Sequence, residues 1–559
     1  MYTPINPVTN PTDEERHRML QDTLENAGRP EDYEYILKNL SPPPDITSIA
    51  SSGDMRGIKI GVLGGGIAGM AAAFELRKLG ADITILEASK DRIGGRIYTY
   101  YFDDDGKLYA EFGAMRVPVS HETSWHYMNL FHLDTETGTT PHYNNFLYVH
   151  NTRLRVTDSV EQYLYPKYEL TPQERATPWG ELIDFAFEYQ IRKLPPEVRA
   201  QMLQILPEYS PEYQPLLNLS VRQYLEAIGL SQGAISLLTG TFPMTGALLD
   251  VSYSETLSED YSMDFVNTYL IQGGFVKLPL AFYQSFQNAY PAQYSAIPPS
   301  LIGTAAYQPG SYVTGIYQSA YRDKVIVRYR HDGEAKDFAE VFDYVVCALP
   351  FSVLREVEIM PFFRNQKMQA IYEFNYADVQ KTAFLCNRRF WERDASYGNI
   401  LGGISFTDLP IQSIIYPSDH NYCPEDTLCS PEDPGILIAS YNLNQQAVRV
   451  GNLEERRRYR LIRENVEEVH GLPRGFLNSI VDSSKTVDWY REPLFRGALT
   501  FALPGQKNSL SYAMTLPEYN NRVFFAGEHI ASKHGWIQGS LYTGKAAANQ
   551  IAYSYKKRP

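Results

Sequence analysis

The 559-residue chain lacks three features that would mark other classes of protein. It has no long hydrophobic run: the most apolar stretch, residues 60–74, is about 15 residues long, rich in glycine and too short to cross a bilayer. It has no excess of basic residues, and a net charge of −14 argues against nucleic acid or an anionic membrane as partner. It has four cysteines, and neither their spacing nor their neighbours suggest a metal site.

The start of the chain also lacks the apolar segment of a signal peptide, because proline, asparagine, threonine and charged residues follow Met1. A mature secreted chain would lack it as well, so the compartment, secreted or cytoplasmic, stays open. Cys347 and Cys386 lie in apolar, strand-like stretches and are predicted to be inert core thiols. Cys423 and Cys429 bracket a short loop, where either a disulfide or two free thiols fits the pattern.

The most informative segment present is a βαβ pattern near residue 60. Residues 58–63 read as a buried strand, a glycine-rich turn opens an alanine-rich helix that ends at Gly80, and residues 82–86 read as a second strand. Gly64, Gly66 and Gly69 have the spacing of the dinucleotide-binding fingerprint. Two of these glycines let the backbone turn and approach a pyrophosphate, and the third lets helix and strand pack closely.

Two further signals follow the βαβ unit. Glu87 ends the second strand, where a carboxylate can accept hydrogen bonds from ribose hydroxyls. A second glycine loop, Gly94-Gly95, is flanked by Arg92 and Arg96. A nicotinamide dehydrogenase has no need of that loop, so the pair of glycine signals favours FAD over NAD.

The C-terminal residues return to the same fold. Residues 522–527 predict a last buried strand, and residues 533–540 open an alanine-rich helix that runs to about Tyr553. Ligands of open α/β sheets bind beyond the carboxyl ends of the strands, so Glu528 and residues 535–540 should lie near the flavin end of a dinucleotide. His529 and His534 are nearby, but their spacing makes neither a general base.

On these residues the chain resembles the flavin-dependent amine oxidase family, and most closely its L-amino acid oxidases. The resemblance covers most of the chain beyond about Met55. Besides the two ends, its motifs are Gly113-Ala114-Met115-Arg116, Gly273-Gly274, Leu278-Pro279, residues 345–350, Phe390-Trp391 and Tyr416-Pro417. The resemblance implies an FAD site, and the absence of any cysteine after Cys429 implies that the flavin is not covalently bound.

The expected fold class is α/β: a Rossmann-like FAD-binding domain of the glutathione-reductase type, interleaved with an α+β substrate domain and a helical insertion. The helical patterns include a stripe formed by Leu182, Phe185, Ala186 and Tyr189. The expected ranges are 1–54 for an N-terminal arm, 55–112, 301–355 and 489–559 for the FAD-binding domain, 113–155, 246–300 and 356–488 for the substrate domain, and 156–245 for the helical domain.

The resemblance also assigns site residues. Arg116 matches the arginine that grips the substrate carboxylate, since a guanidinium holds a carboxylate by two parallel hydrogen bonds. Tyr416 matches a tyrosine that supplies a further donor, and Lys381 a lysine that holds a water near flavin N5. Gly535 offers its carbonyl to the amino group, and Trp536 a flat wall. The implied cofactor-binding positions are Gly64, Gly66, Ile67, Ala68, Gly69, Glu87, Ala88, Gly94, Gly95, Arg96, Gly113, Ala114, Met115, Arg116, Val313, Gly527, Glu528, Gly535, Trp536, Ile537, Gln538 and Ser540.

The implied activity is oxidative deamination of an L-amino acid by hydride transfer from Cα to flavin N5, with oxygen as the second substrate and a homo-oligomeric enzyme. A side chain of apolar or aromatic character is expected. An amino-acid 2-monooxygenase that forms an amide, an amine or polyamine oxidase, and a flavin-binding scaffold without turnover remain as alternatives. The carboxylate-binding role of Arg116 argues against an amine substrate.

Overall fold

The glycine-rich segment folds as the predicted βαβ unit in the computed structural model, which describes residues 9–138, 143–418 and 430–557. Strand β1 (Lys59–Leu63) leads into helix α3 (Ile67–Arg77) and strand β2 (Asp82–Leu86). Both strands join a five-stranded parallel sheet in the order β10-β2-β1-β14-β23. The other strands are β10 (Thr304–Gln308), β14 (Tyr344–Cys347) and β23 (Val523–Phe525).

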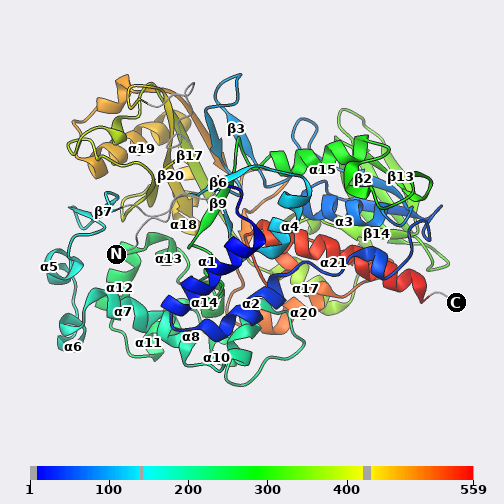
Figure 1. Ribbon diagram of the computed structural model, residues 1–559, viewed down its shortest axis with the longest axis horizontal. Helices are drawn as coiled ribbons and strands as arrows, with labels where there is room; N and C mark the ends of the chain where they lie inside the picture. The colour runs from blue at the N-terminus through cyan, green and yellow to red at the C-terminus, as the bar shows by residue number, and fades with distance from the viewer. Residues whose placement is uncertain (1–8, 139–142, 419–429, 558–559) are drawn as a thin grey trace.

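Segments from both ends of the chain complete this domain. Helix α21 (Ile537–Lys556) packs along α3, and helix α15 (Lys277–Gln287) packs on α3 and β10. An antiparallel meander of β11 (Ser311–Gln318), β12 (Val325–His331) and β13 (Asp337–Phe342), with β15 (Glu358–Met360) parallel to β11, lies beside the sheet. Figure 1 shows this domain on the right, with the red α21 and blue α3 side by side. The α/β class predicted from the sequence is confirmed.

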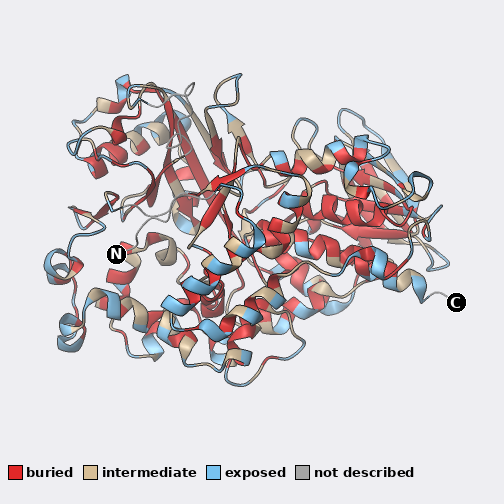
Figure 2. Cartoon of the chain, viewed as in Figure 1, coloured by how far each residue is buried: buried red, intermediate tan, exposed pale blue. Residues whose placement is uncertain are grey.

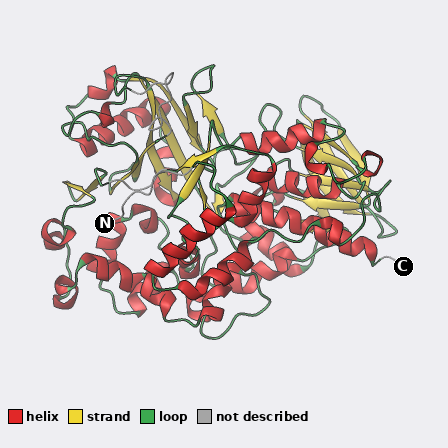
Figure 3. Cartoon of the chain, in the orientation of Figure 1, coloured by secondary structure: helices red, strands yellow, loops and turns green. Residues whose placement is uncertain are grey.

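A second, mainly antiparallel sheet belongs to the segments assigned to the substrate domain. Its order is β21-β17-β20-β19-β18-β7-β8. The strands are β7 (Phe146–Val149), β8 (Thr152–Arg155), β17 (Val379–Cys386), β18 (Gly403–Thr407), β19 (Ser413–Tyr416), β20 (Gly435–Leu443) and β21 (Val481–Asp488). Helix α19 (Glu455–His470) lies against this sheet, and α18 (Asn444–Gly451) follows β20. Figure 3 shows the strands gathered in two separate groups, with most helices between and below them.

Smaller elements connect the two sheets. A three-stranded sheet joins β5 (Val117–Pro118), β9 (Thr268–Ile271) and β6 (Thr135–Thr137), and two ribbons pair β3 (Thr99–Tyr101) with β4 (Tyr109–Glu111) and β16 (Tyr376–Ala377) with β22 (Leu499–Thr500). Helix α4 (Glu122–Leu130) follows β5, and α16 (Phe351–Leu354), α17 (Asn365–Glu373) and α20 (Tyr512–Thr515) lie near the parallel sheet. No helix within the described ranges combines the length and apolarity needed to span a membrane.

The helical region consists of many short helices. They are α5 (Val160–Tyr163), α6 (Pro172–Ala176), α7 (Trp179–Ala186), α8 (Glu188–Arg192), α9 (Pro196–Arg199), α10 (Gln214–Asn218), α11 (Val221–Ala227), α12 (Gln232–Thr241), α13 (Pro243–Gly246) and α14 (Tyr253–Tyr261). The prediction of a single apolar stripe is wrong, because the helix is interrupted at Phe187, between α7 and α8. Leu182 and Ala186 are buried, whereas Phe185 and Tyr189 are exposed and stack on each other at 5.9 Å.

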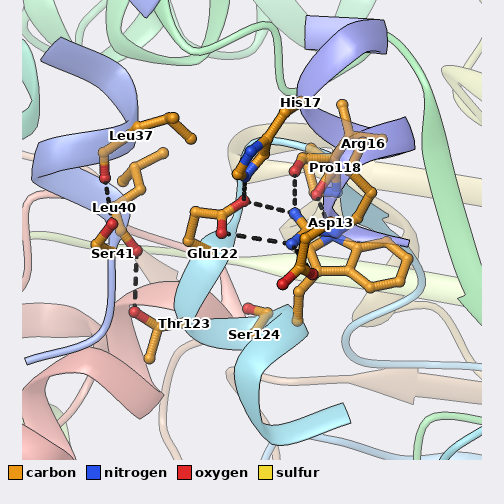
Figure 4. Close-up of polar contacts among 12 residues, drawn as sticks. Asp13, Arg16, His17, Leu37, Leu40, Ser41, Pro118, Glu122, Thr123 and Ser124 are labelled. Atoms are coloured by element: carbon orange, nitrogen blue, oxygen red, sulfur yellow. Dashed lines mark hydrogen bonds and ion pairs between the residues drawn. The ribbon is translucent and has the colours of Figure 1, made fainter. Parts of the chain in front are cut away.

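The N-terminal arm is packed into the body rather than lying loosely on it. Helices α1 (Asp13–Asn26) and α2 (Tyr33–Leu40) bury Leu20, Leu24 and Ile36 in the largest hydrophobic cluster. Figure 4 shows how α1 meets α4: Arg16, buried on α1, pairs with Glu122. Arg16 also donates to the Val119 carbonyl at 2.8 Å. Figure 2 shows the buried surfaces concentrated in the two sheets and in the helices between them.

The positions of two of the four cysteines can be compared with the prediction, and they agree with it. Cys347 and Cys386 are free and buried in the two sheets, as predicted for core thiols. Burial raises the pKa of each thiol, to about 12 for Cys347, so neither is a thiolate at neutral pH. Cys423 and Cys429 lie outside the described residues.

Candidate active site

A cavity of about 300 Å³ lies where the carboxyl ends of the parallel strands meet the second sheet. This volume is in the range of small-molecule sites. One end is lined by the glycine turn after β1 and by the end of β2, and the other by residues of β17, β20 and α14. The two ends are parts of one space, so a long ligand held by its phosphates can reach the second domain.

The glycine turn has the shape of a phosphate cradle. Gly64 has φ +98, a conformation that favours glycine, and Gly66 is the N-cap of α3, whose first N–H groups are free to bind an anion. A Cβ placed on Gly66 would meet nothing closer than 3.9 Å, whereas one on Gly69 would lie 2.1 Å from the Gly64 oxygen. Gly66 therefore borders open space, and Gly69 is needed for packing. These features fit a bound dinucleotide.

Glu87 closes this end of the cavity. Its carboxylate accepts the N–H groups of Gly65 and Ser89, each at 2.7 Å. Burial raises the pKa of Glu87, and these two donors and the Arg92 charge oppose that rise. Glu87 thus holds the glycine turn in place at the point where a ribose would lie. Ala88 and Val313 line the wall next to it.

The second glycine loop lies directly over the first, since Gly66 and Gly94 form a β-bridge. Arg96 donates from one Nη to Glu528 at 2.7 Å and to the Ala498 carbonyl at 2.8 Å. Glu528 also accepts the Gly535 N–H at 3.0 Å. Burial would raise the pKa of Glu528, but Arg96 and two nearby histidines lower it to about 2, so the carboxylate is charged and ties three segments together.

Lys381 on β17 points inward and is buried. Its Nζ donates to the carbonyls of Glu111 at 3.2 Å and Gly113 at 2.9 Å, and lies 4.7 Å from the centre of the Tyr441 ring. Burial lowers the pKa of Lys381 to about 7, and Arg116 lowers it further while Glu111 opposes. The lysine is therefore part of the cavity wall and not a surface residue of the strand.

Arg116 follows the Gly113-Ala114-Met115 segment, and all four residues line the cavity. The guanidinium lies 5.1 Å from the centre of the Phe265 ring. Across the described part of the chain, no hydrogen bond or ion pair satisfies it. Burial lowers the pKa of Arg116, with Tyr441 and Glu259 opposing. A cation held in this way presents its donors to whatever anion enters the cavity.

The segment after β23 forms the opposite wall. Gly527, Gly535, Trp536, Ile537 and Ser540 line the cavity. The Trp536 indole N–H donates to Glu259 Oε1 at 3.0 Å, and its ring meets His121 edge to face at 4.9 Å. The tryptophan is therefore fixed from two sides.

Three predicted positions do not line the cavity. Tyr416 does not line the cavity: it is fully buried in the second sheet, where its hydroxyl lies 2.8 Å from His470 Nε2 and 3.0 Å from Ser405 Oγ. Gln538 points away from the cavity, and its amide nitrogen donates to the Leu40 carbonyl at 2.7 Å and thus joins α21 to the arm. Gly69 also lies behind the wall, in the packing position described above.

Other residues of the cavity were missed by the sequence reading. Tyr441 on β20 pairs in register with Lys381 on β17 and lines the cavity, which Tyr416 does not. Glu259 on α14, Phe265 and Trp489 also line the cavity. Strand pairing alone would have pointed to Tyr441, but the pairing of β17 with β20 is not visible in the linear sequence. Nothing in the sequence marks Glu259.

The fold and this cavity together are those of a dinucleotide-binding α/β protein in which a second sheet lines one end of the cavity. A family model described as flavin containing amine oxidoreductase matches residues 67–552, and the chain belongs to that family. It is accordingly a flavoprotein.

Curated relatives and solved structures agree. L-amino-acid oxidase from Bothrops pauloensis is 27% identical over 535 residues, with 94% of each chain covered. The L-amino-acid oxidase of Notechis scutatus scutatus is 26% identical over 546 residues, covering 97% of this chain and 94% of the relative. Cyclohexylamine oxidase from Brevibacterium oxydans superposes with a TM-score of 0.64 at 16% identity, over 89% of this chain and 100% of that one. Putrescine oxidase bound to putrescine superposes with a TM-score of 0.61 at 19% identity, over 88% of this chain and 98% of that one.

Proposed function

We propose that this protein is an L-amino acid oxidase that converts an L-amino acid to a 2-oxo acid, ammonia and hydrogen peroxide. The observation that carries the proposal is the Arg116 guanidinium, which faces the cavity without a partner among the described residues. A half-buried cation inside a cavity favours a counter-charge, and a planar carboxylate satisfies a guanidinium with two hydrogen bonds. An amine substrate would leave this charge unpaired. The similarity to snake L-amino-acid oxidases supports the same substrate class.

Each side chain then has a defined task. Arg116 binds the substrate carboxylate, and Tyr441 donates a further hydrogen bond to it. The Gly535 carbonyl accepts a hydrogen bond from the amino group, and Trp536 restricts the position of Cα. Lys381, held by two backbone carbonyls, binds a water on the flavin side. When bound, the flavin would supply the two-electron chemistry, as an acceptor of hydride from Cα and a donor of electrons to oxygen. Holding the reacting atoms in one geometry accounts for much of the rate gain.

The cofactor of this proposal is FAD, bound without a covalent bond. Two features support it: the cavity runs from the glycine cradle to the second sheet, as a dinucleotide requires, and no cysteine lines it among the described residues. Phe265 lies beside Arg116, and Met244 and Leu248 also line the cavity, which favours substrates with apolar or aromatic side chains.

Anaerobic mixing with amino acids tests the proposal. The flavin absorbance should be bleached by L-amino acids with apolar side chains, but neither by their D-enantiomers nor by the matching amines without a carboxylate. In air, the products should be 2-oxo acid and peroxide, and acid precipitation should release the flavin. An amide product would indicate a monooxygenase. Failure of every L-amino acid to bleach the flavin would refute the substrate class.

A further inference from the structure

Glu259 is a carboxyl group in the cavity that the tasks described above do not use. It lies on α14, lines the cavity together with Arg116, Tyr441 and Trp536, and is partly exposed there. Its Oε1 accepts the Trp536 indole N–H at 3.0 Å. In the described residues, Oε2 has no hydrogen-bond partner and no ion pair compensates the carboxylate. One oxygen is thus fixed and the other is free.

A zwitterionic amino acid matches this arrangement of charges. Its carboxylate needs the Arg116 guanidinium, and its ammonium group needs an acceptor on the other side of Cα. Glu259 is held by Trp536, the residue that follows Gly535 in the chain, and so belongs to the wall that faces the amino group. Arg116 and Glu259 are close enough to influence each other electrostatically. The cavity therefore offers one cation and one anion to a substrate that carries both.

The ammonium group has to lose a proton before Cα can be oxidised. Its nitrogen lone pair stabilises the positive charge that develops as hydride leaves Cα, and a protonated nitrogen has no lone pair to offer. We propose that the Glu259 carboxylate accepts this proton: an N–H bond of the substrate breaks, an O–H bond forms on Glu259, and the proton later passes to solvent. This inference rests on the proposed amino acid oxidase function.

The surroundings suit a proton acceptor at neutral pH. Burial raises the pKa of Glu259 to about 7; Lys533, Trp536 and Arg116 lower it and Asp264 raises it. The other titratable groups of α14 are Tyr253, Glu255, Asp260 and Tyr261. Tyr441 on β20 and His121 beside Trp536 are titratable groups of neighbouring elements. A general base works best when its pKa lies near the working pH.

Lys381 is another titratable group of the cavity, and it is less suited to this task. Its Nζ already donates to the carbonyls of Glu111 and Gly113. These contacts use the nitrogen as a donor, whereas Glu259 Oε2 is an acceptor without a partner.

Anaerobic stopped-flow measurements across pH test the proposal, with flavin reduction by a good amino acid substrate as the readout. Glu259→Gln keeps an acceptor for the Trp536 indole but cannot take up the proton. At pH 7 its reduction rate should fall about 10²- to 10⁴-fold. The loss should shrink as pH rises, because the substrate then loses its proton to solvent before it binds. Glu259→Asp should recover part of the rate at pH 7 and keep the wild-type pH dependence.

Asp260→Asn is the matched control on the same helix. Its carboxyl does not line the cavity, and burial raises its pKa well above the usual range, so the amide replaces a neutral acid of similar shape. This variant should reduce at the wild-type rate at every pH, and all three should retain flavin. A loss in Glu259→Gln that is constant with pH, or changes with the substrate side chain instead, would overturn the proposal.

Failure of the two proposals can be told apart. Wild-type flavin that no amino acid reduces would end the oxidase proposal and the role of Glu259 with it. If an amino acid reduces the flavin of the wild-type protein, and reduces that of Glu259→Gln equally fast at pH 7, only the proposed role of Glu259 is refuted.

Discussion

Single residues of the same type serve different physical purposes in this molecule, and the glycines after β1 are the clearest case. Gly66 has an ordinary φ of −71 and borders the open cradle, whereas Gly69 touches backbone behind it. The sequence motif names both glycines, but only the contacts separate the one that faces a ligand from the one that allows packing.

Alanine substitutions at these two positions should therefore differ. Gly66→Ala should fold and weaken FAD binding roughly 5- to 150-fold, since one methyl group forced into a close contact costs about 1–3 kcal/mol. Gly69→Ala should fail to fold or lose much stability, because the methyl group would lie 2.1 Å from a backbone oxygen. Flavin titration of the apoprotein and thermal unfolding check the pair. Equal stability of both variants would contradict the assignment.

Arg116 is the residue on which the substrate class depends. Arg116→Met should lower kcat/KM for amino acids roughly 30- to several-thousand-fold, because removing one partner of a buried charge pair costs about 2–5 kcal/mol. Arg116→Lys should recover only part of this, since an ammonium lacks the planar fork. Flavin content should stay normal, and slow turnover of an amine without a carboxylate should not worsen. Wild-type kcat/KM in Arg116→Met would remove the main support for an amino acid substrate.

Tyr441 and Tyr416 form a matched pair on adjacent regions of the second sheet. Tyr441→Phe should lower kcat/KM about 10- to 150-fold, the effect of one hydrogen bond of about 1.5–3 kcal/mol to a charged carboxylate. Tyr416→Phe should leave kcat/KM near wild type and lower thermal stability, because its hydroxyl bonds only to His470 and Ser405 in the core. Steady-state kinetics decide it, and the reverse pattern would restore the original assignment of Tyr416.

At the scale of elements, the sequence patterns that were read correctly are those determined locally. The start of α1 follows from such a local signal, because Thr12 and Glu15 form a capping box. The helical stripe around Phe185 failed because α7 ends at Ala186 and Phe187 leaves the helical conformation, although the apolar period continues. The N-terminal arm, expected over residues 1–54 as a segment of its own, supplies buried residues to the main core.

Arg29 ties the arm to the helix that carries Glu259. It is fully buried, lies 3.1 Å from Asp32 and 3.3 Å from Glu188, and donates to the carbonyls of Asp260 and Tyr261. Arg29→Met should destabilise the protein by up to about 3–5 kcal/mol, since the fully buried Asp32 then keeps only Arg199 as a charged partner and two buried carbonyls lose their donor.

Arg18→Met is the control for Arg29→Met. Arg18 lies on α1, and its pair with Glu14 is exposed on both sides, so the change should cost about 0–1 kcal/mol. Thermal unfolding of the two variants under identical conditions checks the contrast. Similar midpoints would show that the arm contributes little to the stability of the body.

At the scale of the whole molecule, buried groups of two kinds act on stability in opposite directions. Burial lowers the pKa of His470 to about 4. Between pH 6.5 and 4, His470 is therefore protonated in the unfolded chain but stays neutral in the folded protein. The contribution of His470 to the free energy of unfolding is therefore fully present above pH 6.5 and is lost as pH falls towards 4. Burial raises the pKa of Glu111 to about 7, so its contribution is present at low pH and lost as pH rises from about 4.5 to 7.

Two variants should therefore tilt the pH dependence of unfolding in opposite senses. The free energy of unfolding of His470→Gln should rise relative to wild type by up to about 1.4 kcal/mol per pH unit as pH falls from 6.5 towards 4. For Glu111→Gln it should rise relative to wild type by a similar amount per pH unit as pH rises from 4.5 towards 7. Unfolding midpoints at several pH values in this window test both. Parallel pH curves for wild type and either variant would contradict the burial of that neutral group.

The sequence by itself determined the class of fold, the dinucleotide cradle and most of the flavin-facing residues, because these follow from local rules: a strand, a glycine turn and a helix in consecutive order. It also located Arg116 and Lys381, which stand within recognisable segments. Only the tertiary structure decided which tyrosine lines the cavity and that Glu259 lines it as well. The pairing of β17 with β20 places Tyr441 beside Lys381. The packing of α14 against the Trp536 segment places Glu259 at the cavity. Such contacts join residues far apart in the chain, and no local pattern encodes them.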